Sequence, residues 1–216
     1  MRVKAYNGFK QAFKAIIPED QEYPVVWHKL GPGDSVGEHF HPKANEWAVI
    51  DSETEISLDF ENQEIEGRGT RAVHFPSGYI HSMKANKGMV YFVIRDGIDD
   101  IIYLEDVLKT RPSIKPEEDA CGLLWNLHNS ENLSIAYAEV AAPARRHKHQ
   151  KMQEKYRIEK GEGQLFIGNK VLDISKGDVI KIPKNSWHYL KRVKRKPLEV
   201  LVITHPKYDP SDRIFE

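Results

Sequence analysis

A pattern of histidine, glutamate and proline residues occurs twice in this 216-residue chain and constrains its fold more than any other feature. The pattern has two histidines separated by one residue, then a glutamate, and further on a proline and a third histidine. It occurs as His39, His41, Glu46, Pro76 and His81, and again as His147, His149, Glu154, Pro183 and His188. The shift is 108 residues for the first three positions and 107 for the last two. Such a repeat indicates duplication of one structural unit.

The local hydrophobic pattern predicts short β-strands. Residues 56–60 alternate apolar with polar side chains, and residues 90–94 and 200–203 are short β-branched runs. Turn sequences rich in Gly, Pro and Asn separate these segments, which is typical of an all-β sandwich or barrel. We predict little helix: residues 7–16 have some helical spacing, and residues 117–124 could form a helical turn or two.

The boundary between the two copies is expected in a segment with two prolines. Residues 109–118 contain Pro112 and Pro116 and few apolar side chains, as linkers do. We therefore predict an N-terminal domain at 1–108, a linker at 109–118 and a C-terminal domain at 119–216. A domain of about a hundred residues is large enough to bury a core.

Composition argues against several classes of function. Lys+Arg and Asp+Glu both number 32, so no basic excess indicates a nucleic-acid partner. No apolar run is long enough for a membrane helix and the N-terminus lacks the apolar segment of a signal peptide, so we expect a cytoplasmic protein without a membrane partner. Cys121 is the one cysteine, which excludes an intramolecular disulfide and a thiolate cluster.

Strand periodicity indicates how the second copy of the pattern is arranged. His147 and His149 are two residues apart and therefore share one face of a strand. Glu154 is five residues further on, so residues 150–153 are expected to form a turn before a second strand. On that strand Glu154 and Tyr156 face inward, because the alternate residues are charged.

The third histidine of each copy follows a proline turn on a later strand, so three imidazoles and one carboxylate converge. A lone inward histidine is usually a hydrogen-bonded core residue, but burying this whole set without a metal would leave polar groups unsatisfied. The donors suit iron, manganese, nickel, cobalt or zinc, with positions left for water, substrate or dioxygen. The predicted ligands are His39, His41, Glu46, His81, His147, His149, Glu154 and His188.

These motifs resemble those of the cupin superfamily. Its first motif sets HxH and a glutamate between two glycines, and its second contains a proline, a glycine, a histidine and an asparagine. The matching turn residues are Gly33, Gly78, Gly161 and Gly177, and the departures are Glu53, Thr70, Ala85, Ala141, Asn185 and Arg192. The departures affect turns and motif ends and spare the ligands. The resemblance covers nearly the whole chain and implies two tandem cupin barrels of the double-stranded β-helix, or jelly-roll, type.

Two finer resemblances bear on function. The HxH of the first half, followed by Glu46-Trp47-Ala48, is similar to the HxH…EWA stretch of oxalate decarboxylases, which are also two-domain cupins. The stretch from residue 161 to 200 resembles cupins of mannose-6-phosphate isomerases and related proteins. The leading hypothesis is a metal-dependent enzyme of the dioxygenase or decarboxylase type, acting on a small polar or carboxylated substrate. The alternatives are a sugar or sugar-phosphate isomerase and a non-catalytic cupin that binds a small molecule.

Two further residues are catalytic candidates. Tyr156 is a possible acid or hydrogen-bond donor, although inward tyrosines more often serve packing. Arg145 would share a strand face with His147 and is a candidate to clamp a carboxylate or phosphate, although such an arginine more often lies at the barrel mouth as a solvated charge. The second half keeps the closing glycine of the first motif and adds Tyr156, so we favour it as the active half. The resemblance is also compatible with a homodimer.

Overall fold

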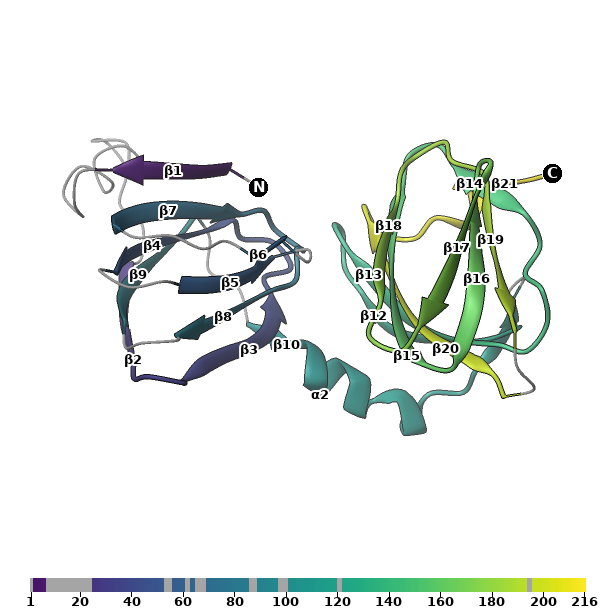
Figure 1. The fold of residues 1–216 in the computed structure, drawn as a ribbon, viewed down its shortest axis with the longest axis horizontal. Coiled ribbons are helices and arrows are strands. Elements are labelled where there is room, and N and C mark those ends of the chain that lie inside the picture. Colours follow the sequence, from purple (N-terminus) through teal and green to yellow (C-terminus); the bar gives the residue numbers. More distant parts are fainter. Residues whose placement is uncertain are drawn as a thin grey trace. The chain divides into compact units, whose positions relative to one another are not determined.

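The structure, a computed structural model, describes residues 2–6, 25–52, 56–60, 63–64, 69–85, 89–96, 101–119, 122–193 and 196–216. The chain divides into two compact units, Met1–Asp106 and Val107–Glu216 (Figure 1). Most described residues lie in strands. The helices among them are α2 (Leu104–Lys109) and the 3-10 turns η1 (Arg111–Ser113) and η2 (Pro210–Asp212).

The first unit has two antiparallel sheets. One has the strand order β1 (Arg2–Tyr6), β7 (Gly69–Phe75), β4 (Glu46–Ser52), β9 (Met89–Arg95) and β2 (Val25–Leu30). The other has the order β10 (Ile102–Tyr103), β3 (Ser35–Phe40), β8 (His81–Ala85), β5 (Ile56–Phe60) and β6 (Gln63–Glu64). The core joins side chains of both sheets, among them Ile50, Phe75, Met83 and Val93.

The second unit repeats this arrangement. Its larger sheet has the order β11 (Glu117–Asp119), β12 (Gly122–Asn129), β13 (Ser134–Val140), β20 (Leu198–His205), β15 (Gln153–Lys160) and β18 (Val179–Ile182). The smaller sheet has the order β17 (Lys170–Ser175), β16 (Glu162–Ile167), β19 (His188–Arg192), β14 (His147–His149) and β21 (Arg213–Phe215). Leu165, Leu190 and Val200 lie in the core between them.

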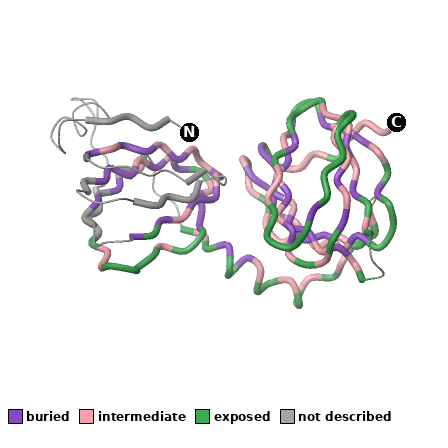
Figure 2. Tube along the Cα trace, viewed as in Figure 1, coloured by how far each residue is buried: buried purple, intermediate pink, exposed green. Residues whose placement is uncertain are grey.

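Corresponding strands occupy corresponding places in the two units. β4 lies between β7 and β9 as β15 lies between β18 and β20, and β10 pairs with β3 as β21 pairs with β14. The prediction of an all-β fold of two jelly-roll barrels with little helix is confirmed. Burial alternates along β15, where Glu154, Tyr156 and Ile158 are buried. Figure 2 shows buried stretches in both units.

The helical prediction for residues 117–124 was wrong. Glu117, Glu118 and Asp119 pair in antiparallel register with Leu124, Leu123 and Gly122. Gly122 has φ +125°, which no α-helix allows, and a Cβ there would lie 2.3 Å from the carbonyl oxygen of Glu139. The other predicted helix, residues 7–16, and Cys121 lie outside the described residues.

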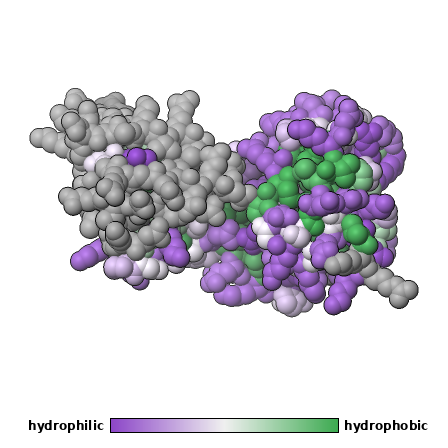
Figure 3. All heavy atoms as spheres, viewed as in Figure 1, coloured by the Kyte–Doolittle hydropathy of each residue, from purple (hydrophilic) through white to green (hydrophobic). Residues whose placement is uncertain are grey.

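Apolar side chains also reach the surface. On the face shown in Figure 3, hydrophobic residues gather on the second unit. Val171, Leu172 and Val193 are among its exposed large hydrophobic side chains. Among the residues that the structure describes, no helix is long and apolar enough to cross a bilayer.

Candidate metal centres

The second unit brings four predicted ligands together from three strands. His147 and His149 lie on β14, Glu154 is near the start of β15, and His188 begins β19 opposite His147. All four are buried, and their ligand atoms lie within 4.8 Å of one another. The turn before His188 depends on Asn185, which has φ +62° and donates its backbone N–H to the carbonyl oxygen of His149 at 2.6 Å.

Backbone carbonyl groups fix the tautomer of two of these histidines. His147 Nδ1 lies 2.9 Å from the carbonyl oxygen of Arg145, and His188 Nδ1 lies 2.9 Å from that of Ser186. A carbonyl oxygen only accepts, so each Nδ1 carries the hydrogen. The lone pair of each Nε2 is therefore directed to the centre of the group, which is the arrangement of a metal-binding imidazole.

The protonation states also suit a metal. Burial, followed by the neighbouring His188, lowers the pKa of His147 to about 4. Burial alone would raise the pKa of Glu154, but the neighbouring imidazoles, His188 first, outweigh it and give a pKa of about 2. At neutral pH the group thus offers the neutral imidazole of His147 and the ionised carboxylate of Glu154, as metal coordination requires.

Buried nitrogen atoms without hydrogen-bond partners show what this group lacks. His149 Nε2 and His188 Nε2 make no hydrogen bond of normal geometry, although His188 Nε2 lies 2.7 Å from a Glu154 oxygen. Leaving such atoms unsatisfied is costly. A cation among them would satisfy the set, so the residues fit a divalent transition metal.

The first unit repeats this geometry. His39 on β3, Glu46 on β4 and His81 on β8 form a buried group with His41, again with ligand atoms within 4.8 Å. The carbonyl oxygens of residues 37 and 79 accept hydrogen bonds from His39 Nδ1 at 2.8 Å and His81 Nδ1 at 3.0 Å. Burial, followed by His81, lowers the pKa of His39 to about 4. In both units, backbone carbonyl groups therefore orient the imidazoles in the same way.

The surroundings of the two glutamates differ. Glu46 Oε2 accepts a hydrogen bond from Arg95 Nε at 3.0 Å, and Arg95 is its register partner on β9. Glu154 Oε2 accepts one from the Tyr156 hydroxyl at 3.2 Å, and its register partner on β20 is Thr204. An arginine in one unit thus corresponds to a threonine in the other.

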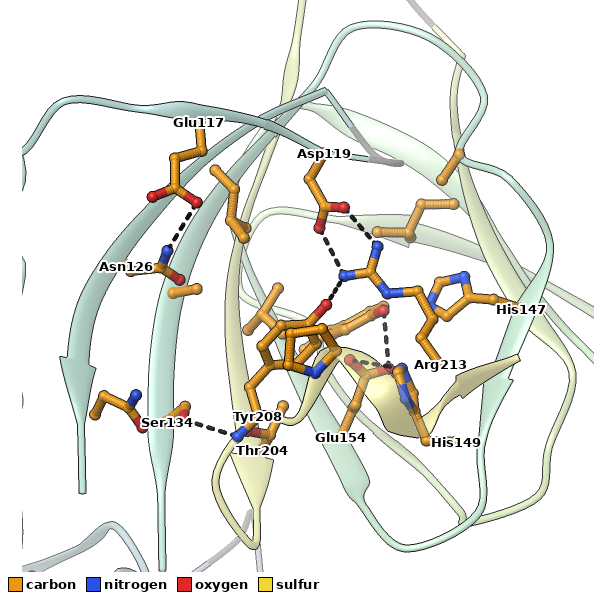
Figure 4. Close-up of a pocket in the computed structure, with 18 of the residues that line it drawn as sticks. Glu117, Asp119, Asn126, Ser134, His147, His149, Glu154, Thr204, Tyr208 and Arg213 are labelled. Carbon is orange, nitrogen blue, oxygen red and sulfur yellow. Dashed lines mark hydrogen bonds and ion pairs between the residues drawn. The ribbon is translucent and has the colours of Figure 1, made fainter. Parts of the chain in front are cut away.

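A cavity adjoins each group. The one in the second unit has a volume of about 370 Å³, and His147, His149 and Glu154 contribute to its lining (Figure 4). Tyr156 lines it as well. The one in the first unit has about 150 Å³ and is lined in part by Arg95. The larger cavity gives the second group more room for a bound molecule.

The two further candidates lie in different places. Tyr156 is buried, lines the cavity and contacts Glu154, as expected for two residues on the same face of a strand. Arg145 does not point inward: its side chain is exposed, with the guanidinium carbon 4.3 Å from the centre of the Phe215 ring. The reason is that β14 begins at His147, so strand alternation does not extend back to residue 145.

Four residues near the groups were not predicted: Arg95, Thr204, Asp212 and Arg213. Arg95 and Thr204 directly follow the runs at 90–94 and 200–203 that predicted strands, so extending those strands would have found them. Asp212 and Arg213 carry no comparable signal. β21, which begins at Arg213, reaches the site by pairing with β14.

Comparison with known proteins gives matches of three kinds. The family model described as a cupin domain matches residues 135–204, which include all four ligand residues of the second group. An uncharacterized protein of Methanocaldococcus jannaschii is 30% identical over 82 residues, which are 38% of this chain. The match spans 66% of that protein, just under two thirds of its length.

Two solved structures are similar in fold at low sequence identity. The oxalate decarboxylase of Lactobacillus farciminis, in complex with formate, is 17% identical with a TM-score of 0.45, over 88% of this chain and 78% of that one. The oxalate decarboxylase of Bacillus subtilis, studied for its Mn(II) centres, is 16% identical with a TM-score of 0.46. The match covers 92% of this chain and 72% of that one. The sequence match to the cupin family is to residues 135–204, within the second unit.

Proposed function

We propose that the chain is a two-domain cupin with a divalent transition-metal centre in each domain. The proposed domains are residues 1–108 and 119–216, joined by residues 109–118. In the second domain we further propose an enzymatic centre of the dioxygenase or decarboxylase type, acting on a small polar or carboxylated molecule. The repeated ligand groups support the first part and the larger cavity supports the second.

One observation carries the enzymatic proposal. His147, His149 and Glu154 belong to the ligand group and also line the 370 Å³ cavity. A molecule in this cavity would therefore meet the metal directly, and not through a layer of protein. A metal with open positions supplies a site where a carboxylate or enolate oxygen is polarised, or where dioxygen is activated.

The chain's own residues would orient the ligands and limit access of water. The Tyr156 hydroxyl donates to Glu154, which fixes the carboxylate and keeps a proton close to the centre. Leu190 and Val202 make part of the cavity wall apolar, which favours exclusion of water. Arg145 is exposed, so the clamp role proposed for it requires its side chain to leave Phe215.

The test is turnover by the metal-loaded chain of 216 residues. The chain is loaded with Mn²⁺ or Fe²⁺ and given a panel of small 2-oxo and 2-hydroxy acids, sugars and sugar phosphates. Oxygen uptake, carbon dioxide release and sugar isomerisation are recorded. We expect activity that is lost in the His147→Ala/His149→Ala variant and kept in His39→Ala/His41→Ala. Binding without any gas exchange would contradict the enzymatic proposal and favour a binding protein. Isomerisation of a sugar would favour the isomerase alternative.

A further inference from the structure

We propose that the cavity of the second unit takes a molecule with one metal-binding end and an uncharged, hydroxyl-bearing body. The Thr204 hydroxyl is one of the groups that bind this body. This inference rests on the proposed function, since it assumes a metal in the second group. It names the class of substrate that the centre accepts.

A polar row leads from the ligand group across the larger sheet. Glu154 on β15 is the register partner of Thr204 on β20, which is the partner of Ser134 on β13, which is the partner of Asn129 on β12. All four line the cavity. Three strand spacings separate the ends of the row, about 14 Å at about 4.8 Å each. The cavity thus offers polar contacts far beyond the reach of a two-carbon acid.

Thr204 is the member of this row that lacks a partner. The residue is 3% exposed, and its Oγ1 has no hydrogen-bond partner. The neighbouring Ser134 hydroxyl is satisfied, since it donates to Asn129 Oδ1 at 2.9 Å and accepts from the Tyr208 backbone N–H at 2.8 Å. A buried hydroxyl without a partner is unfavourable, and a hydroxyl group of a bound molecule would supply one.

The charges of the lining disfavour a second anionic group on the molecule. The lining has three carboxylates, Glu117, Asp119 and Glu154, and one guanidinium, Arg213. Asp119 accepts hydrogen bonds from Arg213 at 2.5 and 2.9 Å, and Arg213 also donates to the Tyr208 hydroxyl (Figure 4). Arg213 is therefore already neutralised.

A bound dication brings the charge of this lining to zero, and an anionic end on the metal then makes it negative. A carboxylate or phosphate at the far end would meet the exposed carboxylate of Glu117 without a free cation beside it. Uncharged hydroxyl groups meet Asn126 and Asn129, which are exposed at this end and offer both donors and acceptors. Ala136 and Val202 contact the carbon chain between them.

The test compares three six-carbon probes in calorimetric titrations. Gluconate has one carboxylate and a hydroxylated body, glucarate adds a second carboxylate at the far end, and hexanoate lacks the hydroxyl groups. The protein is the Mn²⁺-loaded His39→Ala variant of the 216-residue chain, in which only the second group is complete, and its metal content is measured first. We expect gluconate to bind at least about tenfold more tightly than glucarate or hexanoate, which corresponds to one lost or repulsive polar contact.

Matched variants test the role of Thr204. Thr204→Val keeps the shape and removes the hydroxyl, so it should weaken gluconate binding about five- to tenfold and leave hexanoate unchanged. Thr204→Ser keeps the hydroxyl, so its affinity for gluconate should stay within about threefold of that of the parent. Three results would overturn the inference with the metal centre intact. Glucarate could bind as tightly as gluconate, gluconate could fail to bind, or Thr204→Val could bind gluconate as tightly as the parent does. Absence of metal would instead refute the proposed function.

Discussion

The carboxylate of Asp212 supports the turn between the two ligand-bearing strands of the second group. It is 4% exposed and accepts four backbone hydrogen bonds: from Gln150 at 3.1 Å, from Lys151 at 3.0 Å to each oxygen, and from Met152 at 3.0 Å. Burial alone would raise the pKa of Asp212, but these N–H groups outweigh it and lower the pKa. Replacing Asp212 should therefore disturb the position of Glu154.

The magnitude follows from the hydrogen bonds lost. In Asp212→Asn the charge is removed and one oxygen becomes an NH₂ group that faces backbone donors. Hydrogen bonds to a charged group contribute about 1.5–3 kcal/mol each, so we expect the free energy of unfolding to fall by about 2–4 kcal/mol. Metal affinity at the second centre should fall about 10- to 100-fold, as is typical when a group that orients ligands is lost.

The assay combines urea unfolding of the metal-free chain with Mn²⁺ titration of each centre, distinguished by the His39→Ala and His147→Ala variants. Asp209→Asn is the matched control: Asp209 is half-buried and caps η2 by accepting from Ser211 N at 2.9 Å. Asp209→Asn should lower the free energy of unfolding by about 1 kcal/mol or less and leave the Mn²⁺ affinity of both centres unchanged. If Asp212→Asn behaved like this control, the supporting role of the carboxylate would be wrong.

Three further predictions concern pH, the ligand carboxylate and a turn. In the metal-free chain His39 and His147 have pKa values of about 4, against 6.5 for the unfolded state, so the unfolded state takes up more protons as pH falls from 6.5 to 4. Stability should fall over that window by about 3 kcal/mol for each residue, and a urea midpoint that does not change would contradict this. Tyr156→Phe removes the hydrogen bond to Glu154 and should lower stability by about 1 kcal/mol and Mn²⁺ affinity several-fold; unaltered affinity in titration would argue against a positioning role. Gly161→Ala should lower stability by about 1–3 kcal/mol, because φ is +87° and the new Cβ would lie 2.7 Å from a carbonyl oxygen; an unchanged melting temperature would refute it.

The ligand groups could be predicted because they depend on two local regularities. Spacing of two residues places His147 and His149 on one face, and the charged alternates of the next strand direct Glu154 and Tyr156 inward. The repeat then made the same prediction for the first unit. Periodicity failed for Arg145, which precedes the strand, so its side chain is exposed.

The residues that complete the larger cavity could not be predicted, because distant segments bring them there. β21 pairs with β14 across more than sixty positions of sequence, and that pairing places Arg213 at the site. Thr204 depends on the register between β20 and β15. The helix expected at 117–124 failed for a similar reason: that segment pairs along β11 and β12, and Gly122 adopts a positive φ.

The metal content of the purified chain tests the central claim most directly. Elemental analysis is made on the native protein and on the His39→Ala/His41→Ala and His147→Ala/His149→Ala variants, before and after refilling with Mn²⁺. Two complete groups predict two ions for each native chain and one for each variant. No stoichiometric metal in the native protein, even after refilling, would contradict the claim that these groups are metal centres.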